Sequence, residues 1–244
     1  MPSQGRVTSI FAIFIIWQVL AVLISSDMFP SCIDVFKSLF YHFNEGELFF
    51  HLVITLGRVF ITFIIAMSLG IIFGILMGSY KKVDTLLDTL LIIGLNIPAL
   101  VTIIICYIWF GLTDTAALLA VIINKVPTVI VTVREGAKTI DQKYMQIAKV
   151  YKVSKFETLT KVYLPQIYPY IMASARTGLS LIWKIVLVVE LLGRSDGIGF
   201  QLSMFFQFFD ITSIMAYSMA FIIVILLIET YILRPLEKKA NSWR

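Results

Sequence analysis

Long apolar runs recur along almost the whole chain, and most are near the length that a helix needs to cross a bilayer. Six such runs lie at 10–24, 52–79, 86–110, 116–133, 170–192 and 213–233. About 20 apolar residues in a helix span a hydrocarbon layer roughly 30 Å thick. Because the backbone must satisfy its own hydrogen bonds inside lipid, these runs are expected to be helical. The sequence therefore predicts an all-α integral membrane protein with six transmembrane helices.

The composition agrees with a membrane protein. Of the 244 residues, 59% are hydrophobic and 14% are charged, and the mean hydropathy of +0.92 exceeds what one water-soluble core can bury. The first apolar run follows Arg6, as the core of a signal peptide would. No small-x-small cleavage pattern follows Ile24 and five further runs do, so we predict a retained helix.

Lysine and arginine positions predict the orientation of the spans, because loops that face the cytoplasm carry an excess of these residues. The loops at 25–51, 111–115 and 193–212 hold only Lys37 and Arg194. The segment after the fourth span and the C-terminal tail are rich in basic residues: Arg134, Lys138, Lys143, Lys149, Lys152, Lys155, Lys161, Arg234, Lys238, Lys239 and Arg244. We predict a cytoplasmic N-terminus at 1–9, a transmembrane domain at 10–233 and a cytoplasmic tail at 234–244.

Small residues and prolines mark the interior of several spans. The second span carries small side chains at intervals of four: Ala66, Gly70, Gly74 and Gly78. In lipid such a face lets a second helix approach closely, either as plain packing or as a sliding contact. Pro98 and Pro127 each remove a backbone donor, so we expect them to interrupt spans three and four. Interrupted helices often line a transport pathway.

The basic segment at 134–161 is too polar to enter the bilayer and too periodic to be only a loop. Residues at helical spacing within it are Ile147, Val150, Tyr151, Ser154, Thr158 and Val162. We predict a helix that ends at Leu164-Pro165, with Pro169 starting the next span. Such a helix suits two roles, which are contact with anionic lipid and docking into a groove on a soluble partner.

The same segment resembles the cytoplasmic loop of ABC-importer permeases, whose motif reads E-A-A, three residues, G, nine residues, I-x-L-P. Gln146-Ile147-Ala148 occupies the E-A-A position, Lys152 the glycine, and Val162-Tyr163-Leu164-Pro165 the I-x-L-P. The spacing matches, whereas the glutamate and the glycine do not.

The rest of the chain resembles the permease branch that imports nitrate, taurine, alkanesulfonates, bicarbonate and thiamine precursors. Its pattern is matched in order by Thr55-Leu56-Gly57-Arg58, Ile97-Pro98-Ala99-Leu100, Trp109-Phe110-Gly111, Pro127, Arg176, Trp183, Glu190, Gly197-Ile198-Gly199-Phe200, Leu236-Glu237-Lys238-Lys239 and Trp243-Arg244. The resemblance covers roughly 28–244.

This resemblance implies the fold of a type I ABC importer permease with a cytoplasmic coupling-helix loop at 134–169. It also implies the partners: a second copy of the chain, two cytoplasmic ATPase subunits and an extracytoplasmic substrate-binding protein, all at a bacterial inner membrane. Residues expected to couple to the ATPase are Gln146, Ala148, Tyr151, Lys152, Val153, Ser154, Phe156, Leu164 and Pro165. Lys152 places a cation where the family has no side chain, so we expect an acidic or carbonyl-rich cleft on the ATPase.

Nothing in the sequence predicts catalysis by this chain. It has no phosphate-binding loop of the form G-x-x-x-x-G-K-[ST], so ATP and magnesium are expected on the ATPase subunit, with no cofactor here. His42 and His51 have no third ligand nearby, so we expect no metal site. A nucleic-acid partner is not expected.

Two lysines fall near mid-membrane, where an ionisable group is costly and is a functional candidate by default. Lys125 in span four and Lys184 in span five have only carboxylates near the membrane surfaces as partners in the chain. One hypothesis is an anionic solute whose path is lined by Asn96, Pro98, Asn124, Lys125, Arg176, Lys184 and Glu190. The other is internal pairing, for instance of Lys184 with Glu190, or a lysine in a wet cavity without a solute role.

Two functions from different classes follow. The first is a permease subunit of an ATP-driven importer that moves a small anion by alternating access. The second is an ion-driven secondary carrier or channel, in which Glu190, Glu229 and the lysines relay charge without an ATPase.

Overall fold

The computed structural model describes residues 2–26 and 28–236, and the side chains of 8, 11–26 and 28–236. Most of the predicted tail, with Lys238, Lys239 and Arg244, lies outside the described residues. Over the described part the chain is all-helical, which confirms the predicted class. The elements are α1 Pro2–Ile24, α2 Cys32–Asn44, α3 Leu48–Ser79, α4 Lys81–Asn96, α5 Ala99–Phe110, α6 Asp114–Lys138, α7 Gln142–Val150, α8 Lys155–Glu157, η1 Thr158–Tyr163, α9 Leu164–Gly193, α10 Ile198–Gln207, α11 Ile211–Ile228 and η2 Glu229–Leu233.

Three of these helical segments are long and apolar enough to cross a membrane: Leu48–Ser79, Asp114–Lys138 and Ile211–Leu236. A fourth span is formed if α4 and α5 count together, because they are bent by 97° about a short break. The apolar part of α1, Phe11–Ile24, is shorter. α9 carries Arg176, Lys184 and Glu190 along its length. Each predicted apolar run thus lies in a helix or in the bent pair, while the number of six spans stays a prediction.

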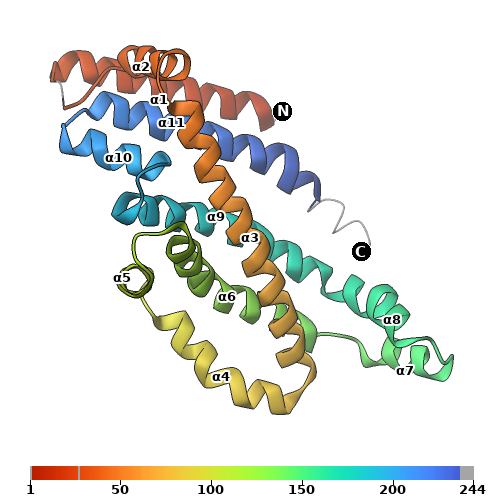
Figure 1. Cartoon of the computed structure of the whole chain (residues 1–244). Helices are drawn as coiled ribbons and strands as arrows, with labels where there is room; N and C mark the ends of the chain where they lie inside the picture. Colours follow the sequence, from red (N-terminus) through yellow and green to blue (C-terminus); the bar gives the residue numbers. More distant parts are fainter. Residues whose placement is uncertain (1, 27, 237–244) are drawn as a thin grey trace.

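The centre of the molecule is the close packing of α3 on α6 and of α6 on α9 (Figure 1). A Cβ at Gly70 would lie 2.3 Å from Val129, and one at Gly74 would lie 2.7 Å from Val133. One at Gly78 would lie 2.4 Å from the Ala137 side chain. The small-residue face of α3 therefore packs directly on α6, as expected of helices that associate in lipid through close backbone approach.

The two prolines of spans three and four have different effects. Pro98 follows the end of α4 at Asn96 and precedes α5, so it interrupts its span as predicted. Pro127 lies inside the unbroken helix α6, so the predicted interruption of span four is wrong. A single proline removes one hydrogen bond, which a long helix packed on both sides tolerates. α4 packs on the Pro127 ring, since a Cβ at Gly94 would lie 2.9 Å from Pro127 Cγ.

The basic segment is also arranged differently from the prediction. α6 continues to Lys138, α7 is a separate nine-residue helix, and a turn at 151–154 follows. The chain is then continuously helical from Lys155 to Gly193, through the π-helical turn η1, so Leu164-Pro165 does not end the helix. Pro165 lies in the first turn of α9, directly after the π-helical turn η1. Pro169 lies inside α9 and does not start it.

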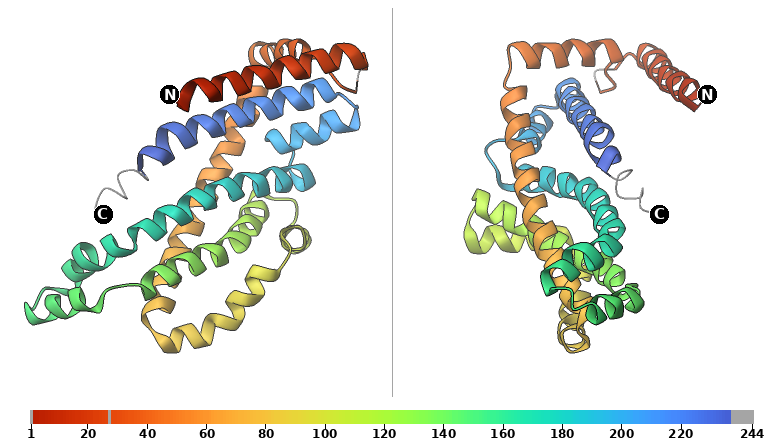
Figure 2. Two further views of the ribbon diagram at one scale, coloured as in Figure 1. Left: turned by 180° about the vertical axis from the view of Figure 1, so that it is seen from behind. Right: turned by 90° about the vertical axis from the view of Figure 1, so that its right-hand side faces the viewer.

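Different helix ends and connections lie at the two ends of the bundle. In Figures 1 and 2 the start of α1 and the end of α11 lie toward the same end as α7 and α8. The α1–α2 connection, the α10–α11 connection and α5 lie toward the opposite end (Figure 1). The helix α2, which lies within the predicted loop 25–51, is found toward that opposite end (Figure 1).

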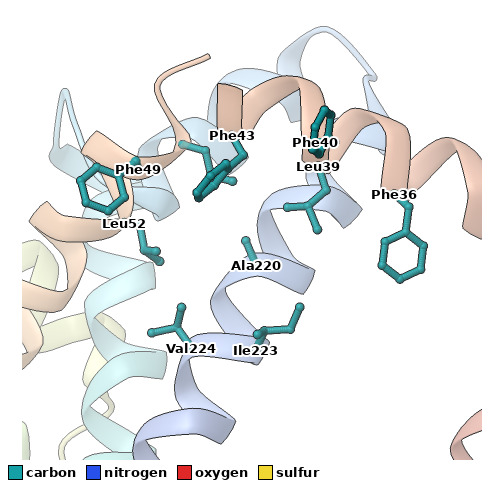
Figure 3. A pocket seen from close by; sticks show the side chains of 10 residues that line it. Phe36, Leu39, Phe40, Phe43, Phe49, Leu52, Ala220, Ile223 and Val224 are labelled. Carbon is teal, nitrogen blue, oxygen red and sulfur yellow. The ribbon is translucent and has the colours of Figure 1, made fainter. Parts of the chain in front are cut away.

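An apolar groove of about 360 Å³ lies between α2, the start of α3 and α11 (Figure 3). Phe36, Phe40 and Phe43 of α2 stand above Ile223 and Val224 of α11 (Figure 3). The residues that line it have no charged side chain. The groove therefore has no charged side chain that would bind a charged solute.

Candidate functional site

The coupling segment, residues 139–163 between α6 and α9, turns sharply after α7. Lys152 has a φ of +51°, in the left-handed region that favours glycine. Its N–H donates to the Lys149 carbonyl at 3.1 Å, and the Val153 N–H donates to the Ala148 carbonyl at 2.9 Å. These two bonds form a Schellman motif, the usual helix end built around a left-handed residue. Lys152 therefore adopts the backbone conformation for which the family motif has glycine.

The turn points large side chains outward. Tyr151 is 78% exposed and Phe156 is 75% exposed, and Val150 is exposed beside them. Ala148 is buried, so it packs inside the chain and is not part of this surface. Two exposed aromatic side chains on a stiff turn are suited to enter a cleft on another protein, since buried aromatic anchors dominate most interfaces.

A second cap stiffens the exit from the turn. Ser154 accepts a hydrogen bond from the Glu157 N–H at 3.2 Å, and its hydroxyl donates to Glu157 Oε2 at 3.2 Å. The Glu157 carboxylate also pairs with Lys161 at 2.9 Å. The hydrogen bond from Lys161, followed by that from Ser154, lowers the pKa of the Glu157 carboxyl. The start of the long helix that becomes α9 is thus fixed directly after the coupling turn.

A polar stripe runs along the exposed face of α9. Arg176, Ser180 and Lys184 follow at intervals of four and are exposed, with Thr177 beside them. The Thr177 and Ser180 hydroxyls donate to carbonyls of their own helix. Arg176, Thr177 and Ser180 line a groove of about 460 Å³ between α9 and α11. Arg176 pairs there with Glu229 at 3.3 Å.

Lys184 has no carboxylate partner among the residues that the structure describes. The suggested pairing with Glu190 does not occur, because the carboxylate of Glu190 is taken by Arg58 at 2.8 Å. Charged and hydroxyl groups on the outer face of a membrane helix are costly against lipid. The polar stripe lies on the predicted fifth span, where it would need water or another protein chain opposite it.

Lys125 occupies a different position from Lys184. It is 3% exposed, and its Cε would lie 3.1 Å from a Cβ at Gly178 on the buried face of α9. The missing side chain at Gly178 therefore makes room for the lysine. The sequence placed the two lysines together at mid-depth, whereas the structure puts Lys125 inside the bundle and Lys184 on its surface.

A network of charges joins α3, α6 and α9 near the last residues of α9 and the loop that follows it. Arg58 donates to Glu190 Oε1 at 2.8 Å and to Asp114 Oδ1 at 2.7 Å, and it also pairs with Asp196. Arg194 donates to Asp114 Oδ2 at 3.0 Å. Glu190 is fully buried, and buried charges persist only when they are paired and hydrogen-bonded.

The loop after α9 is built around the Glu190 carboxylate. The Thr55 hydroxyl and the Gly199 N–H each donate to Glu190 Oε2 at 2.9 Å. Gly197 has a φ of +99°, and a Cβ there would lie 2.4 Å from the carboxylate. Its N–H donates to His51 Nδ1 at 2.9 Å, which makes that nitrogen an acceptor. The glycines of the 197–200 motif are therefore required by this close approach.

Residues 66–233 match the family of binding-protein-dependent transport system inner membrane components. The chain belongs to this family. The permease thus works in a membrane, with a binding protein, and is a transport component rather than an enzyme. The predicted recognition and function class are confirmed.

Three curated relatives indicate which branch of the family the permease is similar to. The permease is 29% identical over 95% of its length to SsuC of Bacillus subtilis, a permease protein named for aliphatic sulfonates, of which 84% is covered. It is 27% identical over 82% of its length to the taurine transport system permease protein TauC of Escherichia coli, of which 73% is covered. It is 29% identical over 82% of its length to the bicarbonate transport system permease protein CmpB of Synechococcus elongatus, of which 74% is covered.

Solved structures show the same fold. A chain of the MetNI methionine ABC transporter, solved in inward-facing conformations, aligns with 79% of the permease and 99% of its own length, at a TM-score of 0.65 and 17% identity. A chain of an amino acid ABC transporter solved with histidines aligns with 79% of the permease and 93% of its own length, at a TM-score of 0.60 and 19% identity. The all-helical architecture is therefore that of ABC importer permeases.

The structure separates the residues that the sequence grouped. Of the coupling residues, Tyr151, Lys152, Val153, Ser154 and Phe156 form the exposed turn. Gln146 faces a pocket beside α3. Leu164 and Pro165 lie in the first turn of α9.

The predicted path residues scatter over several helices. Asn96 and Pro98 are exposed at the α4–α5 break, and Asn124 donates to the Ala120 carbonyl of its own helix. Arg176 and Lys184 share the polar stripe.

Sequence reasoning missed two features of the permease. The charge network around Arg58 joins residues 138 positions apart, and no local sequence pattern predicts it. The cap from Ser154 to Glu157 has a local signature, S-x-x-E, which would have located the start of the helix.

Proposed function

We propose that the permease crosses the inner membrane six times, with both termini and the coupling segment in the cytoplasm. The spans would be the helices over 10–24, 52–79, 86–110, 116–133, 170–192 and 213–233. The concentration of lysine and arginine in the coupling segment and the tail supports this orientation. The common end reached by α1, α11 and α7 fits it (Figure 1).

The permease would act as a homodimer with its polar stripes facing each other. Arg176, Ser180 and Lys184 would then line a water-filled path between two copies of α9, which removes the cost of exposing them to lipid. This stripe is the observation on which the proposal rests. The α4–α5 break at Asn96 and Pro98 would bend as the path opens to either side.

The coupling segment would transmit closure of the ATPase pair to the bundle. Tyr151 and Phe156 would enter a cleft on the ATPase, which binds ATP and Mg²⁺, and Lys152 would face acidic or carbonyl groups there. Because η1 and α9 are one continuous helix, a displacement of the turn moves the polar stripe with it.

The solute would be a small oxyanion or a molecule with an anionic head. The relatives are named for aliphatic sulfonates, taurine and bicarbonate. Lys184 supplies a positive charge on the stripe, and Lys125 adds positive potential from inside the bundle. Glu190 has its carboxylate filled by Arg58, Thr55 and Gly199, so we assign it to anchoring the outer loop instead of solute contact.

The test is ATP-dependent uptake by proteoliposomes that contain the permease, its ATPase and its binding protein. Sulfonates, taurine, nitrate and bicarbonate would be offered in turn. Lys184→Met should lower uptake of the preferred anion about tenfold or more, since a hydrogen bond to a charged group contributes about 1.5–3 kcal/mol. Lys37→Met, at an exposed lysine on α2, is the matched control. Unchanged uptake and unchanged preference in Lys184→Met would refute the anion path.

A further inference from the structure

A pocket of about 710 Å³ lies between the end of α3, α7 and η1. Leu76 and Leu159 belong to its apolar wall, while Ser79 and Tyr163 bring hydroxyl groups. The two hydroxyl oxygens are 2.6 Å apart, so a hydrogen bond ties the last turn of α3 to η1. π-helical turns such as η1 often occur at functional sites. The pocket therefore combines an apolar wall with polar groups at one edge.

Two lysines give the pocket a positive charge. Gln142, Gln146 and Lys149 share one face of α7 and line the pocket, and Lys155 lines it from the start of α8. No lining residue is acidic. The nearby Glu157 carboxylate pairs with Lys161, not with Lys155. Lys149 and Lys155 have no carboxylate partner within the described ranges, so the pocket has an uncompensated charge of about two.

The position of the pocket indicates which kind of molecule would compensate the positive charge of Lys149 and Lys155. α3 is one of the long apolar helices, and the pocket lies against its last turns, at Leu76 and Ser79. A basic, amphipathic surface next to the end of a membrane helix attracts anionic headgroups. Free anions need only the polar edge, whereas a lipid also uses the apolar wall and the large volume.

We propose that this pocket binds the phosphate headgroup and part of an acyl chain of an anionic phospholipid. Lys149 and Lys155 hold the phosphate, the amides of Gln142 and Gln146 bond to the headgroup, and the chain lies along Leu76 and Leu159. Since α7 and η1 form the pocket, a bound lipid braces the coupling segment against α3. The site goes beyond the transport role, because it requires neither a particular solute nor the polar stripe.

The experiment uses the full permease purified with its ATPase subunits in a non-ionic detergent. Binding of phosphatidylglycerol, phosphatidylcholine and soluble glycerol phosphate is titrated by native mass spectrometry. Lys149→Gln plus Lys155→Gln removes both pocket charges. Lys82→Gln plus Lys143→Gln removes two exposed charges that do not line the pocket, as the matched control.

A lysine near an anionic lipid surface contributes about a fivefold change in affinity, so the pocket double variant should bind phosphatidylglycerol about 30-fold more weakly. The control double should change this affinity less than twofold, and phosphatidylcholine should bind weakly throughout. Equal losses in the two doubles would overturn the site. Binding of glycerol phosphate as tight as that of phosphatidylglycerol would show a soluble phosphate ligand and overturn the lipid assignment. Loss of ATPase with retained lipid binding would concern coupling alone and would leave the site supported.

Discussion

Removal of the Glu190 carboxylate should destabilise the permease more than removal of either of the other two carboxylates that pair with Arg58. In Glu190→Ala the Thr55 hydroxyl and the Gly199 N–H lose their acceptor, and Arg58 loses the only fully buried carboxylate of its three. Arg58 keeps Asp114 and Asp196 as partners, so the cost comes from the two buried donors left without an acceptor and from the lost buried ion pair, together about 3–5 kcal/mol. At this chain length about 1 kcal/mol shifts the unfolding temperature by roughly 2–4 °C, so a fall of about 6–20 °C is expected.

Asp114→Ala is the matched control for this prediction. Asp114 pairs with the same arginine at 2.7 Å, but its side chain is 55% exposed. Water can replace this partner, so the loss should be about 1 kcal/mol. Glu190→Gln keeps an acceptor for Thr55 and Gly199 and should fall between the two. Thermal unfolding in detergent measures all three variants. An equal shift in Glu190→Ala and Asp114→Ala would refute the reasoning that burial of Glu190 anchors the loop.

Two further predictions concern the coupling turn and α2. Lys152→Gly should stabilise the turn by about 1 kcal/mol, because a side chain at φ +51° is disfavoured; slower amide hydrogen exchange at Val153 would show it, and faster exchange would contradict it. Burial lowers the pKa of His42, whose Nε2 lies 2.9 Å from the Ser213 hydroxyl. The unfolded imidazole therefore takes up a proton first, and the stability that neutral His42 contributes is lost as pH falls below about 6.5. His42→Gln should remove this part of the pH dependence of thermal unfolding, and an unchanged pH profile would contradict the assignment.

The sequence predicted the helices well because their signal is local. Apolar runs of about 20 residues and the turn-forming prolines and glycines lie within single elements, and Pro98 does end a helix. The failures arise where packing overrides a local preference. Pro127 lies in an unbroken helix that packs on α3, α4 and α9, and Pro165 lies inside a continuous helical stretch directly after η1.

The site was predictable only in part. The spacing of the family motif located the turn at Lys152, and the left-handed backbone explains why that spacing is kept without a glycine. Counting charges along the chain also found Lys125 and Lys184. It could not tell that Lys125 lies inside the α6–α9 packing and Lys184 on the exposed face of α9, because that depends on the space left at Gly178. Likewise the partner of Glu190 is 132 positions away at Arg58.

The role of the coupling segment is tested by whether the exposed aromatic side chains of Tyr151 and Phe156 hold the ATPase. The double variant Tyr151→Ala plus Phe156→Ala is compared with Phe40→Ala plus Tyr41→Ala, which removes two exposed aromatic side chains from α2. Co-purification of the ATPase and its hydrolysis rate with the permease are measured. The first variant should lose the complex and the stimulated hydrolysis, while the second should keep both. An unchanged complex and rate in the first variant would contradict this role and would return the coupling segment to the lipid surface.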